Sequence, residues 1–198
     1  MNIPVQKEIL MASPRIIAGQ AKGLRLKSVP GDITRPITDR VKEALFNIIS
    51  ADIVNSKFLD LFGGTGSVGI EALSRGASFV QFIDKNQAAC TILKENLIKS
   101  GFSDKANIRK IDAFTYIQSI SDAYFDYIFI APPQYFNLWS KMVELIDLKI
   151  GFLNENAWVI TQIDPKEYEE LTLNNLEQFD SRDYGSTRLI FYSQISNV

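Results

Sequence analysis

From residue 58 onward, short apolar segments alternate with amphipathic ones, and this alternation constrains the fold more than any other feature of the 198-residue chain. The apolar segments predict strands at 58–62, 79–83, 108–111, 125–130 and 158–161. The segments between them predict helices at 67–75, 86–100, 113–120 and 138–148, and the second of these is expected to be capped by Asn86 and to end at Gly101. Such alternation specifies a mainly parallel, doubly wound α/β sheet. Because crossovers are right-handed, the carboxyl ends of the strands meet at one edge, where ligands bind.

The amino-terminal quarter of the chain is basic and lies outside this alternation. Residues 1–50 carry a net charge of +4, whereas the whole chain carries −2. We divide the chain into a tail (1–13), a basic extension (14–50) and a body (51–198). In the extension, two extended runs are expected to form a hairpin, and Thr38 is expected to cap the following helix. A basic arm on an acidic body suggests a face for a polyanion, with scattered solvated side chains as the alternative.

The carboxyl-terminal part is predicted to complete the sheet. Two further extended runs lie at 175–179 and 188–192, which brings the expected number of strands to seven. A helix is predicted at 166–171, with the acidic side chains of Glu167, Glu169 and Glu170 on its solvated face.

The residue composition excludes several kinds of chemistry. The chain has no His and a single Cys, Cys90. Catalysis by Ser-His-Asp or Cys-His groups, His metal sites and cysteine clusters are therefore excluded, and we expect no metal. A lone Cys forms no intramolecular disulfide, as is typical of a reducing cytoplasm. Because no apolar run approaches the roughly 20 residues that span a bilayer, we expect a cytoplasmic protein without a membrane partner.

The loop after the first predicted strand, Gly63-Gly64-Thr65-Gly66, is the clearest candidate for a ligand site. Gly64, Gly66 and Gly69 fit the spacing G-x-G-x-x-G of dinucleotide-binding loops. Asp84 lies 18 residues beyond Gly66, at the end of the next predicted strand. A carboxylate at that place is expected to accept hydrogen bonds from ribose hydroxyls. The pattern therefore indicates a ligand that contains a nucleoside.

A carboxylate close to this loop distinguishes between two such ligands. Asp60 stands three residues before Gly63, where an NAD-binding protein would place a pyrophosphate. Its negative charge would repel a pyrophosphate and attract the ammonium group of S-adenosylmethionine. Asp112 ends the third strand as Asp60 and Asp84 end the first two. We favour S-adenosylmethionine, and an NAD-dependent oxidoreductase remains the alternative.

The residues from 60 to 66, together with 70–77, resemble motif I of S-adenosylmethionine-dependent methyltransferases. The chain is most similar to the bacterial RsmD-type methyltransferases, which modify a guanine N2 amine of small-subunit ribosomal RNA. Further similar segments are an opening hairpin, an arginine-proline segment with the first helix, and a closing hairpin, at 15–26, 35–43 and 184–187. The resemblance implies a Rossmann-like class I fold, a seven-stranded sheet, and a catalytic domain at 51–198 behind the extension.

The resemblance also implies roles for individual residues. Those expected at S-adenosylmethionine are Thr38, Asp60, Phe62, Gly63, Gly64, Thr65, Gly66, Asp84, Lys85, Asp112 and Ala113. Those expected at RNA phosphates are Arg15, Lys22, Arg25, Lys27, Arg35 and Arg40. The implied partner is ribosomal RNA or the small ribosomal subunit, and nothing in the sequence marks an oligomer interface, so we predict a monomer.

The segment after the fourth predicted strand departs from the family. Enzymes of this type usually have Asp or Asn, Pro-Pro and an aromatic residue there, whereas this chain has Ala131-Pro132-Pro133-Gln134-Tyr135. The acid and a proline carbonyl would hold the two hydrogens of the substrate amine, and the aromatic ring would stack on the base. We expect the catalytic residues to be Pro132, Pro133, Gln134 and Tyr135, with Gln134 as the substitute acceptor.

Other functions stay open at this point. The enzyme could work with fewer acceptors, because positioning by itself contributes much of a rate enhancement. The chain could also bind RNA and cofactor without turnover, or methylate a small molecule or an adenine in DNA.

Overall fold

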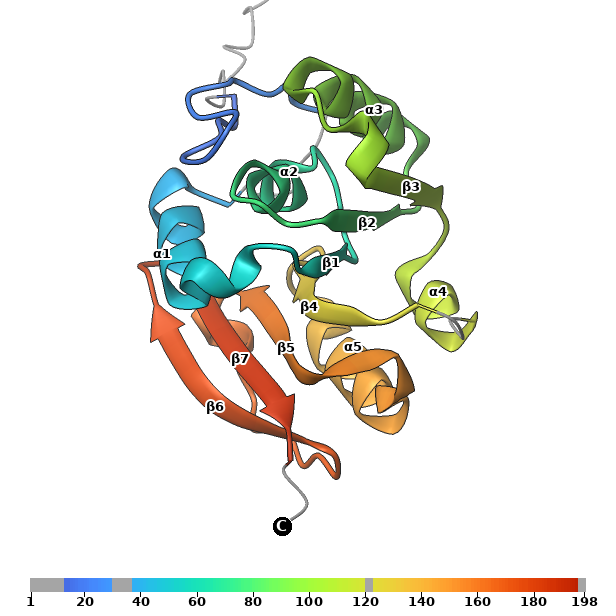
Figure 1. Cartoon of the computed structure of the whole chain (residues 1–198). Coiled ribbons are helices and arrows are strands. Elements are labelled where there is room, and N and C mark those ends of the chain that lie inside the picture. The colour runs from blue at the N-terminus through green and yellow to red at the C-terminus, as the bar shows by residue number, and fades with distance from the viewer. Residues whose placement is uncertain (1–12, 30–36, 120–122, 196–198) are drawn as a thin grey trace, which may run out of the picture.

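The predicted segments form helices and strands in a computed structural model, which describes residues 13–29, 37–119 and 123–195 (Figure 1). The strands are β1 (Lys57–Asp60), β2 (Phe79–Asp84), β3 (Ala106–Lys110), β4 (Phe125–Ile130), β5 (Leu153–Ile163), β6 (Leu176–Asp183) and β7 (Arg188–Gln194). The α-helices are α1 (Asp39–Ile49), α2 (Ser67–Ser74), α3 (Gln87–Ser100), α4 (Ala113–Ser119) and α5 (Leu138–Leu148). Short 3-10 turns lie at Ser50–Ile53, Ser103–Lys105, Ile150–Phe152 and Pro165–Glu167.

The strands of the described residues form one seven-stranded sheet with the order β3-β2-β1-β4-β5-β7-β6. Neighbouring strands from β1 to β5 are parallel, whereas β7 is antiparallel to both β5 and β6. This topology confirms the predicted Rossmann-like α/β fold. The switch in strand order lies between β1 and β4, so the carboxyl ends of these strands meet where a doubly wound sheet binds ligands.

Each face of the sheet is covered by helices, as the two hydrophobic clusters and Figure 1 show. The first cluster joins α1, α2 and α3 to one face and includes Phe46, Leu73 and Leu93. The second joins α4 and α5 to the other face and includes Ile117 and Trp139. Apolar side chains along the central strands therefore enter both clusters, which explains why those strands are apolar on both faces.

Local signals begin and end the helices as the sequence predicts. The Thr38 hydroxyl accepts a hydrogen bond from the Val41 amide at 3.3 Å, and Asn86 Oδ1 accepts one from the Ala88 amide at 2.8 Å. These side chains satisfy amides that have no partner within the first turn of α1 and α3. Gly101 ends α3 in the left-handed conformation, with φ of 77°.

The amino-terminal extension begins with a short hairpin that contains one antiparallel bridge, between Arg15 and Arg25. Its turn lies against α2, because the Gln20 amide donates to the Ser74 carbonyl at 2.8 Å. A Cβ at Gly19, where φ is 80°, would lie 1.8 Å from that carbonyl oxygen. Only glycine therefore allows the backbone of the turn to approach α2 this closely.

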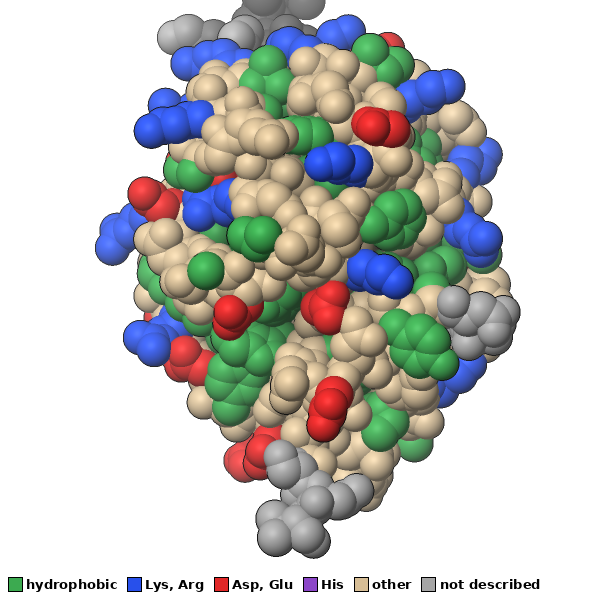
Figure 2. All heavy atoms as spheres, viewed as in Figure 1, with side chains coloured by type: hydrophobic (Ala, Val, Ile, Leu, Met, Phe, Trp, Pro, Cys, Tyr) green, Lys and Arg blue, Asp and Glu red, His purple; other side chains and the backbone are tan. Residues whose placement is uncertain are grey.

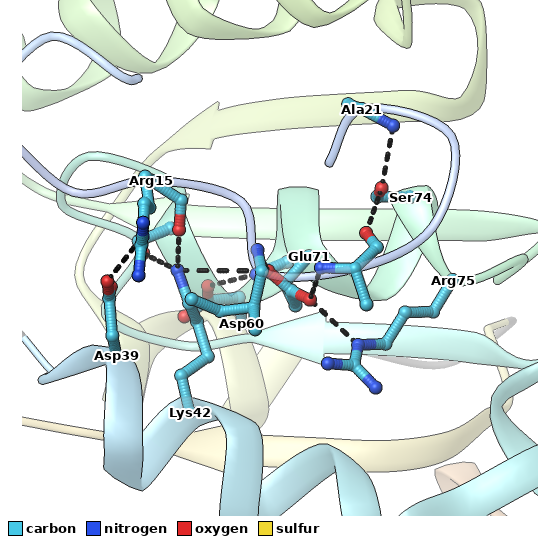
Figure 3. A network of polar contacts seen from close by, with 12 residues as sticks. Arg15, Ala21, Asp39, Lys42, Asp60, Glu71, Ser74 and Arg75 are labelled. Atoms are coloured by element: carbon cyan, nitrogen blue, oxygen red, sulfur yellow. Dashed lines mark hydrogen bonds and ion pairs between the residues drawn. The ribbon is translucent and has the colours of Figure 1, made fainter. Parts of the chain in front are cut away.

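A buried acid anchors the same hairpin to the helix (Figure 3). The Glu71 carboxylate accepts hydrogen bonds from the amides of Ile17 at 2.7 Å and Ala18 at 3.0 Å. It also accepts one from Arg75 Nε at 2.7 Å, which compensates its charge. A buried carboxylate needs such partners, so the hairpin and α2 stabilise each other.

Lys42 joins α1 to this network. Its ammonium group donates to the Arg15 carbonyl at 2.7 Å and to Ser67 Oγ at 2.8 Å, and lies 3.8 Å from the Glu71 carboxylate. Burial lowers the pKa of Lys42, and the negative charge of Glu71 acts in the opposite direction. Because Ser67 is the first residue of α2, the network reaches the end of the predicted ligand loop.

One predicted helix is wrong. The predicted helix at 166–171 is a single 3-10 turn, Pro165–Glu167, followed by extended chain. The Glu167 carbonyl accepts a hydrogen bond from the Trp139 indole at 3.3 Å, and the Tyr168 ring stacks on that indole. These contacts with α5 hold the segment against the second cluster and use a carbonyl that a helix would need. Glu167 is therefore half-buried and does not lie on a solvated helix face.

Candidate active site

The loop after β1 has the compact shape that its glycines predict. The Gly63 amide donates to the Ile83 carbonyl at 2.9 Å, and the Gly66 amide donates to the Gly63 carbonyl at 2.7 Å. Gly66 has φ of 79°, and a Cβ there would lie 2.1 Å from a Leu93 methyl group. The backbone therefore turns within four residues and leads directly into α2.

Asp60 lies at the base of this loop. It is the last residue of β1, is only 2% exposed, and accepts a hydrogen bond from the Gly69 amide at 3.3 Å. Burial is the main cause that raises the pKa of Asp60 to about 7; the Asp84 carboxylate acts in the same direction, and hydrogen bonds from the Gly69 and Phe62 amides act against it. A cation bound beside Asp60 would favour its charged form, so the site suits a positively charged ligand.

Asp84 connects the end of β2 to the same loop. Its Oδ2 accepts a hydrogen bond from the Gly64 amide at 2.8 Å, and its Oδ1 accepts one from the Asn86 amide at 2.8 Å. Each carboxylate oxygen can accept a further hydrogen bond, which suits the predicted contact with ribose hydroxyls. The structure thus brings Asp60, the glycine loop and Asp84 together.

Three further predicted cofactor residues, Asp112, Ala113 and Lys85, follow β3 and β2 at the same edge of the sheet. Asp112 Oδ1 accepts hydrogen bonds from the Phe114 amide at 3.0 Å and the Thr115 amide at 3.2 Å, so it caps α4. Ala113 is buried at the first position of that helix. Lys85 is exposed after β2. The adenine role of Asp112 and Ala113 stays a prediction.

Two predicted cofactor residues belong to the surrounding framework. Phe62 is partly buried and packs against the second hydrophobic cluster. Thr38 is exposed, and the described contacts of its side chain are those of the α1 cap. Its helix reaches the glycine loop only indirectly, through the hydrogen bond between Lys42 and Ser67.

The loop after β4 contains the four predicted catalytic residues. Pro132 is buried, Pro133 is exposed and Gln134 is half-buried. Tyr135 has φ of 68°, and its side chain is 66% exposed. A non-glycine residue in this conformation is uncommon and requires support from its surroundings.

Two acids provide this support: Asp164, which the sequence analysis did not single out, and Glu167, which it placed on a solvated helix face. The Tyr135 hydroxyl donates to Asp164 Oδ2 at 2.9 Å, and its amide donates to the Glu167 carboxylate. Asp164 follows β5 directly and is 8% exposed. The predicted strand ended at residue 161, whereas β5 ends at Ile163, so the pattern of acids after strands β1 to β3 was not extended to Asp164.

The predicted RNA-binding side chains lie on the surface of the extension and α1. Arg15 forms an ion pair with Asp39 at 2.7 Å, and Lys27 forms one with Glu95 at 2.7 Å. Lys22, Arg25 and Arg40 are exposed, whereas Arg35 lies outside the described residues. Figure 2 shows Lys and Arg side chains around the upper part of this face, where the extension and α3 lie.

A shallow hollow of about 390 Å³ lies between the hairpin and the end of α3. It is lined by Gln20, Ala21, Lys22, Leu24, Lys99, Ser100, Gly101 and Phe102. Two lysines beside an open hollow suit a phosphate backbone better than an enclosed ligand.

Asn96 connects the extension to the glycine loop and was not predicted. Its side chain is fully buried in α3 and forms hydrogen bonds with both backbone groups of Lys27, at 2.8 and 3.1 Å. Its amide group also donates to the Thr65 carbonyl at 2.8 Å. The sequence gives no signal for this role, because the position of Asn96 within a helix does not show which distant backbone groups its side chain contacts.

Residues 13–29, 37–119 and 123–195 contain neither a metal-binding group nor a membrane-spanning helix. No group of three or more His, Cys, Asp or Glu side chains could hold a metal ion. No helix in the same part of the chain is long and apolar enough to cross a membrane.

Comparisons with known proteins cover nearly the whole chain. A family model described as "Conserved hypothetical protein 95" matches residues 14–193. Ribosomal RNA small subunit methyltransferase D of Haemophilus influenzae is 37% identical over 148 residues, or 73% of this chain and 72% of that protein. YlbH of Bacillus subtilis is 33% identical over 182 residues, or 91% and 98%. The solved structure of Escherichia coli yhhF is similar with a TM-score of 0.81 at 27% identity, over 92% and 98%.

Proposed function

Because this chain belongs to the RsmD-type methyltransferase family, whose model is described as Conserved hypothetical protein 95, we propose that it methylates the N2 amine of a guanine in 16S ribosomal RNA. The methyl donor is S-adenosylmethionine. The observation that carries the proposal is the buried Asp60 beside a glycine loop that Asp84 holds in place. A buried anion at this position opposes binding of a pyrophosphate and therefore disfavours the NAD alternative.

The cofactor residues act by orientation and charge. Asp60 and the loop at 63–66 hold the methionine part, whose ammonium group restores the charged form of Asp60. Asp84 would accept hydrogen bonds from the ribose hydroxyls, and Asp112 and Ala113 would hold the adenine. When bound, S-adenosylmethionine supplies a methyl group on a positively charged sulfur.

The loop after β4 positions the acceptor. The lone pair of the guanine N2 forms a bond to the methyl carbon while the carbon–sulfur bond breaks, and its electron pair stays on sulfur. The Pro132 carbonyl would accept a hydrogen bond from the amine, and the cationic product amine would then lose its surplus proton to solvent water. Tyr135 is exposed, with its hydroxyl bonded to Asp164 and its backbone amide bonded to Glu167, and its ring stacks on the guanine. Stacking of this kind requires a base that has left its helix.

The extension binds the RNA. Its exposed cations Lys22, Arg25 and Arg40, together with Arg15, Lys27 and Arg35, contact phosphates and set the register of the RNA without reading bases. We propose that the protein acts in the cytoplasm as a monomer on 16S ribosomal RNA or the small subunit. A sedimentation mass of two chains would contradict the monomer.

The test is transfer of labelled methyl from S-adenosylmethionine to small ribosomal subunits, followed by nucleoside analysis. We expect N2-methylguanosine at one site. Label in another nucleoside would contradict the N2 specificity and keep the methyltransferase.

A second candidate function rests on Ala131, which lacks the acceptor expected at that position. A protein that binds RNA and cofactor without turnover would bind S-adenosylmethionine in a titration and yet leave the subunits unlabelled. The same assay therefore distinguishes the two functions.

A further inference from the structure

We propose that Oε1 of Gln162 accepts a hydrogen bond from the substrate amine and replaces the acid that is absent at position 131. This inference rests on the proposed function, because it requires an amine acceptor at the loop after β4. It assigns to β5 a role that neither the motif nor the family resemblance gives it.

The register of the sheet places Gln162 beside Ala131. β4 and β5 are parallel, and the last pairs of their register join Phe129 to Ile160 and Ile130 to Thr161. The next residues along the two chains are Ala131 and Gln162. Neighbouring positions of parallel strands lie on the same face, so these two side chains start from adjacent points.

The core clusters identify that face. Ala131 packs against the first cluster, and Ile160, two residues before Gln162, belongs to the same cluster. Side chains two residues apart on a strand point to the same face. Phe58 of β1 also belongs to this cluster. Asp60 lies two residues after Phe58 on the same strand, so the predicted cofactor acid lies on this face as well. The face that holds Asp60 and lacks an acid at 131 therefore carries the amide of Gln162.

The Gln162 side-chain oxygen is buried and has no hydrogen-bond partner within the described residues. Gln162 is 9% exposed, and its Oε1 has no hydrogen-bond partner in the part of the chain that the structure describes. Most buried acceptors are paired, because an unpaired one lowers the stability of the fold. An amine hydrogen of the substrate would satisfy this acceptor. The short side chain of Ala131 leaves the neighbouring position without a competing acceptor.

The chemistry needs only an acceptor at this place. The amine nitrogen forms the new bond to the methyl carbon, and the carbon–sulfur electron pair remains on sulfur. The surplus proton then leaves the cationic product amine for solvent water. A neutral amide cannot take that proton, but it can orient the amine so that the nitrogen lone pair faces the methyl group. Gln162 and the Pro132 carbonyl together would accept both amine hydrogens.

Methyl transfer by a Gln162→Met variant tests this role, because methionine has a similar length and lacks the acceptor. We expect kcat to fall about 100-fold, the size seen when one preorganised polar partner of a transition state is removed. The affinity for S-adenosylmethionine is expected to stay within about twofold, and the melting temperature is expected not to fall, since an unpaired buried acceptor is removed. A residue with only a structural role would lower the melting temperature and leave kcat nearly unchanged.

Thr161→Val is the matched control. Thr161 is adjacent on β5, is fully buried, and has a hydroxyl that also lacks a partner among the described residues. Its side chain points to the opposite face of the sheet, toward the second cluster. We expect this variant to keep the wild-type kcat, which separates loss of the Gln162 acceptor from a general effect of changing β5.

A second experiment restores an acid at position 131. Ala131→Asp in the Gln162→Met background is expected to recover at least tenfold of the lost kcat, because the carboxylate would take the same hydrogen. Equal kcat for wild type and Gln162→Met would overturn the inference alone, and so would loss of activity in Gln134→Met with full activity in Gln162→Met. A wild-type protein that binds cofactor but labels no RNA would overturn the proposed function and this inference with it.

Discussion

The loops after β1 and β4 leave the same edge of the sheet, but different kinds of contact hold them. The first loop is held by two backbone hydrogen bonds, from Gly63 to Ile83 and from Gly66 to Gly63, and by the Asp84 carboxylate, which accepts from the Gly64 amide. The second is held by two acidic side chains from the segment after β5, and Tyr135 remains largely exposed. The proposed cofactor loop therefore combines main-chain bonds with side chains of the adjoining elements, whereas the contacts of Tyr135 on the proposed substrate side come from two acids after β5.

The sequence differs between the two loops as well, because the glycine loop fits the family motif and the segment after β4 departs from it at position 131. A side chain at Gly66 would collide with Leu93, so a substitution there would change the shape of the loop itself. Ala131 is partly buried against the first cluster, and Gln162 of the neighbouring strand is the acceptor that we propose in place of an acid there. Substitution of Asp60 should therefore affect cofactor binding, and substitution of Tyr135 should affect turnover.

The largest expected effect is that of Asp60→Asn on cofactor binding. Removal of a buried charge partner should weaken S-adenosylmethionine affinity about 100-fold, and the free energy of unfolding should not fall, because a buried carboxylate opposes folding. Calorimetric titration and denaturant unfolding would measure both quantities. Asp183→Asn, on the distant strand β6, is the control and should bind normally. If Asp60→Asn bound S-adenosylmethionine with unchanged affinity, the ammonium group of the cofactor would not lie beside Asp60.

The second effect is on the pH dependence of cofactor binding. Because burial raises the pKa of Asp60 to about 7, the protonated form predominates below that pH, and a cation binds only the charged form. Affinity should therefore fall about tenfold for each pH unit below 7 and level off above it. Titrations from pH 5 to pH 8 would show this slope, and Asp60→Asn should abolish it.

The same raised pKa predicts a stability change in the protein without cofactor. The unfolded carboxyl ionises near its ordinary pKa of 3.8, whereas the folded one keeps its proton until about 7. The folded state binds more protons in between, so the contribution of Asp60 to stability should decrease as the pH rises from about 4 to about 7. A wild-type unfolding curve with no pH difference from Asp60→Asn would contradict this.

A smaller effect is expected for Tyr135→Phe, which removes the hydrogen bond to Asp164. The loop should lose about 1 kcal/mol of stabilisation, and kcat should fall about tenfold through misplacement of the base. The affinity for S-adenosylmethionine should not change. Single-turnover transfer would measure the effect, with Tyr124→Phe at the opposite end of β4 as the control. A loss of cofactor affinity equal to the loss of kcat would show that the loop after β4 also contributes to cofactor binding.

The smallest effect is expected for Arg25→Gln on RNA binding. One phosphate contact fewer should weaken affinity only a few-fold and reduce the slope of log affinity against log salt by about one. Binding of 16S ribosomal RNA across a salt series would measure this. Arg182→Gln, on β6 at the far edge of the sheet, should leave the slope unchanged. An equal change in both variants would indicate general charge attraction and no defined contact.

The predictions from sequence were accurate where the signal is local. The order of strands and helices followed from apolar periodicity, and the glycine loop followed from residues within seven positions of one another. The helix caps at Thr38 and Asn86 depend on a side chain and an amide two or three residues away. Both partners of such a contact lie within a few residues of each other, so the local sequence is enough to predict it.

The predictions failed where distant segments compete for the same groups. The expected helix at 166–171 is displaced because Trp139 of α5 takes the Glu167 carbonyl and stacks on Tyr168. Asp164 is found beside Tyr135 only when β4 and β5 are paired. Neither partner is near in sequence, and no period marks the contact.

The amino-acid sequence was enough to determine the layered sheet, the edge at which ligands bind and the acid-flanked glycine loop, because these depend on patterns that repeat along the chain or lie within it. Only the tertiary structure decided how the extension joins the glycine loop through Asn96 and which side chain stands beside Ala131. The physical reason is register: the alignment of β4 with β5 selects Gln162, and a shift of one residue would turn that side chain to the other face.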